Sequence, residues 1–202
     1  GRKDFVGFGD PYFSVEQAAN ASKPQPVQVA ALQSRGAFNV RGLPLSLRSA
    51  PKTAKLGSTE LPQLPRLPDT FSEVRSIAKA VNANLNRDVF TGHRATEERV
   101  KIADLSKYKV LAFATHGLVP GDLDGLNQPA LALSNPKLGK STEDGLLTMG
   151  EILSLRLDAD WVVLSACNTA SGNGAGAEAF SGLGRAFFYA GTRALLLSNW
   201  PV

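Results

Sequence analysis

Residues 161–169 read WVVLSACNT, and this stretch organises the rest of the chain. Its first five residues, Trp161 to Ser165, are mostly large and apolar or β-branched, which is typical of a buried strand in a parallel sheet. Cys167, the only cysteine in 202 residues, follows where that strand is expected to end. Chemistry in open α/β sheets gathers at the carboxyl ends of strands, which makes Cys167 a candidate nucleophile. A lone cysteine is also commonly a small buried hydrophobic residue, and this strand alone does not separate the two interpretations.

A second stretch, VLAFATHG at 110–117, has the same design. It predicts a buried strand that ends just before His116 and Gly117. If both strands are parallel members of one sheet, their carboxyl ends lie on one edge, about 5 Å apart where the strands are adjacent. An imidazole activates a nearby thiol by taking its proton, so His116 and Cys167 are predicted to form a Cys–His dyad. The N–H groups of Gly117 and Cys167 are the expected oxyanion hole.

Expected strands alternate with expected helices along most of the chain, which predicts an α/β fold with a mainly parallel sheet and helices on both faces. Capping-box patterns at Thr70–Glu73 and Thr148–Glu151 predict the starts of two helices. The first of these helices should bury a stripe that begins at Phe71. A later helix, over 178–189, should turn four apolar side chains inward, namely Phe180, Leu183, Phe187 and Phe188. The strands are expected at 5–8, 88–91, 110–115, 129–133, 161–166 and 193–198.

The composition, with 43% apolar and 20% charged residues, suits a globular protein. The net charge is +4, but the positive excess is local, because seven lysines and arginines and only one acid, Glu60, lie between Ala21 and Pro68. Phe38 is the only aromatic residue there, so the segment lacks the stacking residues of a typical nucleic-acid surface. We therefore expect no nucleic-acid partner.

Residues 14–68 form a proline-rich, basic insertion in this interpretation. They show no apolar periodicity and contain seven of the twelve prolines. Over much of residues 21–68 we expect little helix or strand and considerable exposure. Two roles stay open, a plain exposed insertion or a regulatory or cleavable surface loop.

The expected compartment is the cytoplasm, and no cofactor is expected. One cysteine forbids an internal disulfide, no apolar run has the length of a membrane span, and Gly1 to Asp4 is not followed by a signal-peptide core. One cysteine and two histidines, spaced 23 and 51 residues apart, fit no zinc motif. The GNGAG run lacks the lysine of a phosphate-binding loop. His93 stands in a polar loop and is interpreted as solvated and non-catalytic.

Seven motifs occur in a familiar order: FVGFGDP, LPDTFSEVRSIAKAV, VLAFATHG, DGLLTMGEIL, WVVLSACNTA, AEAFSGLGRAFFYAG and LLLSNWPV. In these the chain resembles CHAT domains, bacterial relatives of caspases and separase that are often joined to TPR repeats. The resemblance covers 5–13 and 62–202, and ATHG with LSAC is its most specific part. It implies a caspase-like α/β fold and a cysteine endopeptidase, with His116 as general base, Cys167 as nucleophile and Gly117 beside the oxyanion.

The resemblance also implies a single domain over 1–202 that carries the insertion at 14–68. CHAT domains usually continue past the WPV segment with an acidic residue, a helix and a tail. The expectation is therefore a C-terminally truncated domain, or one piece of a cleaved protein whose partner is a C-terminal fragment of the same protein. In caspase-like folds the loop after this last strand lines the substrate pocket, which assigns Asn199 and Trp200 to substrate binding.

Three functions remain to be distinguished. The first is a cysteine endopeptidase that cuts a protein partner, with a TPR-repeat region or a regulatory protein as a further partner. The second is a CHAT-like module that binds proteins without catalysis. The third is another thiol hydrolase or an acyltransferase. The presence of both His116 and Cys167 favours the endopeptidase.

Overall fold

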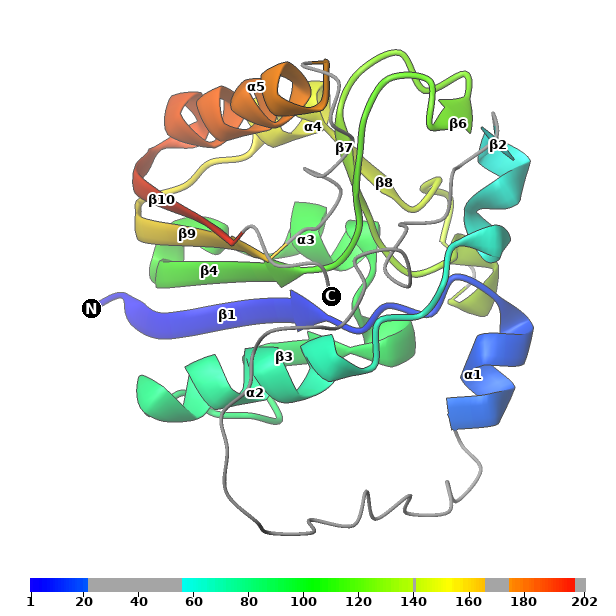
Figure 1. The fold of residues 1–202 in the computed structure, drawn as a ribbon. Coiled ribbons are helices and arrows are strands. Elements are labelled where there is room, and N and C mark those ends of the chain that lie inside the picture. Colours follow the sequence, from blue (N-terminus) through cyan, green and yellow to red (C-terminus); the bar gives the residue numbers. More distant parts are fainter. Residues whose placement is uncertain (22–55, 140, 166–174, 199–202) are drawn as a thin grey trace, which may run out of the picture.

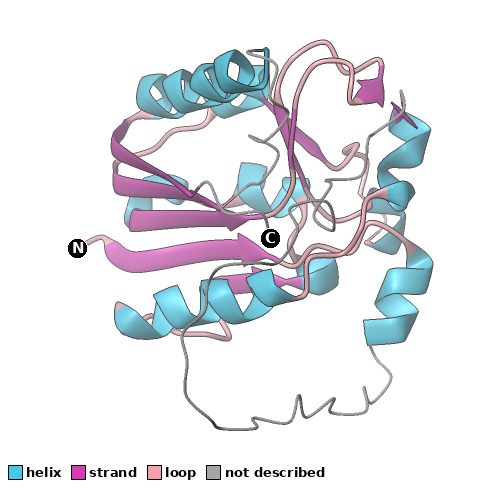
Figure 2. Ribbon diagram, in the orientation of Figure 1, coloured by secondary structure: helices cyan, strands magenta, loops and turns pink. Residues whose placement is uncertain are grey.

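The computed structural model describes residues 1–21, 56–139, 141–165 and 175–198, drawn in colour in Figure 1. Its main sheet has five parallel strands in the order β10-β9-β4-β1-β3. Helices lie on both sides of this sheet (Figures 1 and 2), which confirms the predicted α/β architecture. The strands are β1 (Lys3–Gly9), β3 (Val89–Thr91), β4 (Tyr108–Ala114), β9 (Ala159–Ser165) and β10 (Thr192–Ser198).

Two small sheets accompany the main one. The helices of the described residues are α1 (Val15–Ala21), α2 (Asp69–Ala80), α3 (Glu97–Ile102), α4 (Met149–Ser154) and α5 (Ala175–Ala190). The small sheets are made of β2 (Leu56–Gly57) with β6 (Leu123–Asp124), and of β5 (Gly117–Leu118), β7 (Ala130–Ala132) and β8 (Leu146–Thr148). None of the helices in these described ranges is long and apolar enough to cross a membrane.

The larger apolar core lies between the main sheet and α5. Phe8 of β1 stacks on Phe113 of β4 with 5.3 Å between ring centroids, and Phe113 contacts Phe187 of α5 at 5.6 Å. All three side chains have no exposed surface, as do Val162 of β9 and Leu183 of α5. Burial of this much apolar surface is what favours stacking the helix on this face of the sheet.

A second core lies between the sheet and α2. Phe5 of β1 and Val74 and Ala78 of α2 are fully buried there. Gly9 makes the close packing possible, because a Cβ at this position would lie 2.8 Å from a Val74 methyl group and 3.0 Å from the Thr70 carbonyl oxygen. The glycine of the FGDP motif therefore lets α2 approach the end of β1.

The capping box predicted at Thr70–Glu73 is wrong. Helix α2 begins at Asp69, and its N-cap, Pro68, makes no side-chain capping bond. The Thr70 hydroxyl instead donates to the Leu67 carbonyl at 2.7 Å and accepts from the Asp10 N–H at 2.8 Å. The second predicted box is confirmed, since Thr148 and Glu151 cap α4 reciprocally.

Within residues 21–68, the described part from Leu56 onward is more ordered than expected. Ser58–Gln63 forms a 3-10 helix there, whereas α1 (Val15–Ala21) ends where this stretch begins. Leu61 and Leu64 are only 2% and 3% exposed, because they join a third apolar cluster beyond the sheet edge. The prolines of LPQLPRLP led to the expectation of an exposed segment. Proline excludes α-helix, but it does not prevent the neighbouring leucines from being buried. Residues 22–55 lie outside the described part of the chain.

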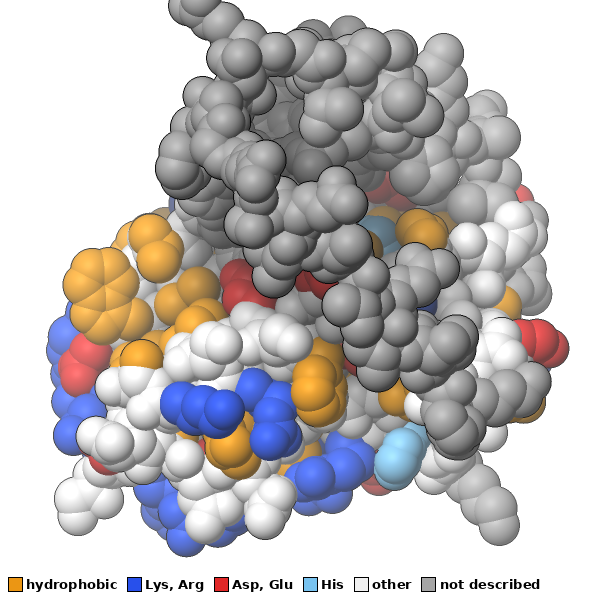
Figure 3. Space-filling model, turned by 60° about the horizontal axis from the view of Figure 1, so that its bottom comes forward, with side chains coloured by type: hydrophobic (Ala, Val, Ile, Leu, Met, Phe, Trp, Pro, Cys, Tyr) orange, Lys and Arg blue, Asp and Glu red, His pale blue; other side chains and the backbone are white. Residues whose placement is uncertain are grey.

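Three side chains expected in the core are exposed instead: Trp161 by 49%, Phe188 by 49% and Phe71 by 40%. Trp161 alternates with Val162, which faces the α5 side, so it points to the α2 side of the sheet. Leu196 of β10 pairs in register with Val163, shares that side and is 52% exposed. Figure 3 shows hydrophobic side chains gathered at one margin of the α2 face. Helix α2 packs over β1, β3 and β4. The exposed Trp161 and Leu196 lie on β9 and β10, at the other end of the strand order.

Candidate active site

The strand ends that carry the predicted site residues are aligned along one edge of the sheet. The register pairs Gly9 with Ala114, Ala114 with Ser165, and Ser165 with Ser198. The Thr115 N–H donates to the Ser165 carbonyl at 3.1 Å and continues the β4–β9 pairing by one residue. Residues that follow these four strands therefore leave the sheet at the same edge, where β1, β4 and β9 end in Figure 1.

His116 stands two residues beyond the end of β4 and is half-buried. Its Nε2 atom lies 2.7 Å from the carbonyl oxygen of Pro65, and its ring centroid lies 5.5 Å from that of Phe13. A carbonyl oxygen only accepts hydrogen bonds, so Nε2 carries the proton of this contact. In the neutral ring, Nδ1 is then the basic nitrogen.

Burial favours the neutral form of this imidazole. It lowers the pKa of His116 below the ordinary value of 6.5, and the bond to Pro65 opposes this shift because it favours a protonated ring. His116 is therefore neutral at physiological pH and able to accept a proton. This is the ionisation state that a general base needs.

Pro65 belongs to a segment that we call the strap, residues 61–67, which contacts residues that follow β1 and β4 at the carboxyl edge of the sheet. Hydrogen bonds hold the strap on both sides of Pro65, at Leu64 and at Leu67. The Gln17 side chain donates to the Leu64 carbonyl at 2.7 Å, and Thr70 donates to the Leu67 carbonyl through both its hydroxyl and its backbone N–H. These contacts fix the direction of the Pro65 carbonyl between them.

Arg66 holds the strap through Asp10, the first residue after β1. Its Nε donates to one carboxylate oxygen at 2.8 Å and its Nη2 to the other at 2.7 Å. The guanidinium also lies 5.0 Å from the ring centroid of Tyr12. Asp10 is 1% exposed. Burial raises the pKa of Asp10, and its hydrogen bonds and charge attraction to Arg66 oppose that rise.

Gly117, the predicted oxyanion residue, is buried and starts β5. β5 pairs antiparallel with β7, with Gly117 opposite Leu131. The Ala132 N–H donates to the His116 carbonyl at 2.9 Å, which makes 117–131 a pair whose own N–H groups point away from the partner strand. Within this described ladder, the Gly117 N–H is therefore not used by β7.

Three predicted site residues, Cys167, Asn199 and Trp200, lie outside the described residues. The structure thus describes His116 and Gly117 of the predicted set and adds one group that the sequence analysis missed, the Pro65 carbonyl. No side-chain pattern announces a backbone acceptor, and residue 65 is 51 positions from its partner. His93 is exposed on the 3-10 helix Gly92–Arg94, as expected of a solvated histidine.

A group of carboxylates elsewhere has the composition of a cation site. Glu97, Glu143 and Glu151 bring ligand oxygens within 4.8 Å of one another. The ammonium of Lys101 lies between them, at 2.6, 2.5 and 2.6 Å from the three carboxylates. The lysine therefore already supplies the positive charge that this cluster needs.

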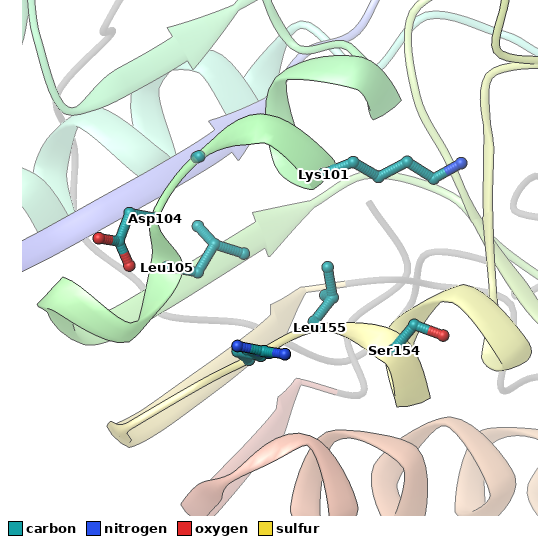
Figure 4. Close-up of a pocket in the computed structure, with 7 residues that line it drawn as sticks. Lys101, Asp104, Leu105, Ser154 and Leu155 are labelled. Carbon is teal, nitrogen blue, oxygen red and sulfur yellow. The ribbon is translucent and has the colours of Figure 1, made fainter.

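A cavity of about 300 Å³ is lined by Lys101, Ala103, Asp104, Leu105, Ser154, Leu155 and Arg156 (Figure 4). These residues lie on the segments that lead into the amino ends of β4 and β9. His116 follows the opposite, carboxyl end of β4. The cavity is accordingly separate from the candidate active site.

The parallel five-stranded sheet with helices on both sides (Figure 1) is an α/β arrangement consistent with a caspase-like fold. The family model of the CHAT domain matches residues 11–202. The chain therefore belongs to the CHAT domain family, whose members are caspase-like peptidase-family proteins. A search of curated proteins finds no match to it.

Proposed function

We propose that this protein is a cysteine endopeptidase that cuts a protein partner, with Cys167 as nucleophile and His116 as general base. The observation that carries the proposal is the 2.7 Å contact between His116 Nε2 and the Pro65 carbonyl. It holds a neutral imidazole in one orientation and leaves Nδ1 as its basic atom. An oriented base beside a nucleophile is the arrangement that nucleophilic catalysis requires.

The strand register supports the pairing of the two residues. Ala114 pairs with Ser165, and positions 116 and 167 each follow these paired residues by two. Adjacent strands are about 4.8 Å apart, so two side chains that leave such strands at the same step come within reach of each other. Cys167 itself lies outside the described residues, and its role rests on this register and on the LSAC motif.

In the proposed reaction, Nδ1 of His116 takes the thiol proton, and the thiolate attacks the scissile carbonyl carbon. The N–H groups of Gly117 and Cys167 stabilise the oxyanion, in line with the Gly117 N–H that β7 does not use. The imidazolium then protonates the leaving amine, which departs and leaves a thioester. A water molecule that gives its proton to His116 hydrolyses the thioester and restores the thiol.

Substrate binding is assigned to Asn199 and Trp200, which directly follow β10. Ser198 continues the row of paired strand ends that begins with Gly9. Groups placed after β10 would flank a peptide that reaches Cys167 along this edge. The partner is proposed to be a protein in an extended conformation, because endopeptidases bind cleavable segments as strands.

The test compares the wild-type chain with Cys167→Ala, His116→Ala and the control His93→Ala in a digest of a peptide library, read by mass spectrometry. We expect cleavage to vanish in the first variant and to fall by about a hundredfold or more in the second, as loss of a general base does. The control should cleave like wild type, since the His93 side chain is exposed on the 3-10 helix Gly92–Arg94.

Two results would overturn the proposal. Equal cleavage by wild type and Cys167→Ala would remove the nucleophile assignment. Tight binding of peptides by wild type without any cleavage would identify a binding module instead. Internal cleavage products separate an endopeptidase from another thiol hydrolase or an acyltransferase, which would modify or deacylate peptides without cutting the chain.

A further inference from the structure

The ion pair of Arg66 and Asp10 joins the strap to the end of a central strand. Arg66 is the residue after Pro65, whose carbonyl contacts His116. Its side chain is 24% exposed, and that of Asp10 is 1% exposed. Both oxygens of the carboxylate are engaged, at 2.8 and 2.7 Å. A two-point contact of this kind fixes direction as well as distance.

Asp10 is itself fixed to the sheet. Its N–H donates to the Thr70 hydroxyl at 2.8 Å, and its carbonyl accepts from the Gly92 N–H at 3.0 Å. Its backbone φ of +46° places it in a left-handed turn directly after β1. The carboxylate is thus presented from a rigid position beside β4, the strand that leads to His116.

The pair and the catalytic contact are adjacent in the chain. Consecutive Cα atoms are only about 3.8 Å apart, so fixing the Arg66 side chain limits the rotation of the peptide unit that carries the Pro65 carbonyl. On the N-terminal side of that peptide unit, the strap is held by the burial of Leu64 and by the hydrogen bond from Gln17 to the Leu64 carbonyl. Loss of the ion pair would leave a buried carboxylate without its partner and let the strap move away from the sheet edge.

We propose that Arg66 and Asp10 are positioning residues that act on His116 through the Pro65 carbonyl. They hold the imidazole ring so that the Nε2 proton stays in its hydrogen bond to Pro65. Nδ1 then remains the basic nitrogen that takes the thiol proton. The consequence for turnover rests on the proposed peptidase function, whereas the consequence for the His116 ring does not. The two claims are therefore measured separately.

The first measurement is the imidazole proton of His116 by NMR. The chain has two histidines, so a His93→Gln background leaves His116 as the only imidazole signal. A hydrogen-bonded Nε2 proton exchanges slowly enough to be seen in water. We expect the signal in the background protein, and we expect Arg66→Met to lose it.

Arg2 provides a matched control. Its Nη2 donates to both carboxylate oxygens of Asp160, at 3.0 and 3.1 Å, and its side chain is 29% exposed, close to the 24% of Arg66. It precedes β1 and therefore lies at the opposite end of the strands from His116. The Arg2→Gln variant should keep the Nε2 proton signal and the wild-type rate.

The second measurement is turnover of a cleavable peptide. We expect Arg66→Met to lower kcat by about tenfold to a hundredfold, the usual effect of a misplaced catalytic group, with KM nearly unchanged. Arg66→Lys, which keeps the charge but not the two-point geometry, should recover part of the loss. A merely structural pair would change the unfolding temperature without moving kcat or the proton signal.

The outcomes are distinct. Should Arg66→Met keep both the Nε2 signal and the wild-type kcat, the positioning role is refuted. If that variant fails to fold, the Asp10→Asn/Arg66→Met double variant, which removes both charges of the pair, takes its place under the same criteria. If Cys167→Ala cleaves like wild type, the peptidase proposal fails, and the NMR signal alone decides whether the pair positions His116.

Discussion

The free energy of unfolding should decrease as the pH is raised from 5 to 8, because one buried carboxyl group, Glu97, loses its proton in this range. Burial raises the pKa of Glu97 from 4.5 to about 7, against the hydrogen bonds that it receives from Lys101 and Gly145. Charge repulsion from the nearby Glu151 carboxylate adds a smaller effect in the same direction as burial. Glu97 is the group that keeps its proton because its side chain is 2% exposed, whereas those of Glu143 and Glu151 are 31% and 32% exposed.

The sign follows from proton binding. Between the unfolded pKa of 4.5 and the folded value of about 7, the native chain holds a proton that the unfolded chain has lost. Raising the pH through this window therefore favours unfolding. The rise from 4.5 to about 7 corresponds to about 3 kcal/mol, most of which is lost between pH 5 and pH 8.

A Glu97→Gln variant makes the prediction measurable. The amide keeps an acceptor for the Gly145 N–H, which lies 2.8 Å from the carboxylate, but it does not titrate. His116 has a lowered pKa and contributes in the opposite direction, because its stabilisation is lost as the pH falls below 6.5. The difference between wild type and Glu97→Gln cancels this contribution, since His116 is present in both.

The assay is urea unfolding followed by circular dichroism at both pH values. We expect wild type to lose about 2 kcal/mol more than Glu97→Gln on going from pH 5 to pH 8. Glu98→Gln, an exposed change on the same helix, serves as control and should behave like wild type. Parallel pH profiles for wild type and Glu97→Gln would refute the assignment of the proton to Glu97.

Three further predictions follow from single sites. Iodoacetamide should modify Cys167 more slowly at pH 7 in His116→Ala than in wild type, because a thiol of ordinary pKa, about 8.5, is mostly protonated there, and equal rates measured by mass spectrometry would contradict activation by His116. Gly191→Ala should cost about 2 kcal/mol or more in urea unfolding, since φ is +115° and a Cβ would lie 2.2 Å from the Leu157 carbonyl oxygen; Gly139→Ala, with open space around it, should cost little. Thr148→Ala should cost about 1 kcal/mol by removing the cap of α4, and a Thr148→Ser variant as unstable as Thr148→Ala would contradict the cap assignment.

The parts of the fold that the sequence predicted well are those with continuous apolar runs. The runs before His116 and Cys167 predict β4 and β9, and Thr148 predicts the start of α4, because burial and capping are local signals. Trp161 was misjudged for a physical reason. An apolar run predicts a strand but does not say where the helical layer above that strand stops.

The candidate site was predictable only in its side chains. His116 and Gly117 stand out by type and position, whereas the Pro65 carbonyl has no residue signature. The Asp10–Arg66 pair joins positions 56 residues apart, and its partners could not be matched before the strap was seen beside β1. Interactions that depend on long-range packing leave little trace in a local pattern.

The group that contacts His116 belongs to the main chain. Mutations at position 65 should therefore have different effects from mutations of a residue that acts through its side chain. A side-chain replacement at position 65 retains a carbonyl, so a mutational scan would score this position as tolerant despite its place beside the histidine. Deleting or inserting one residue within 61–67 would shift that carbonyl by a full peptide unit and would be poorly tolerated.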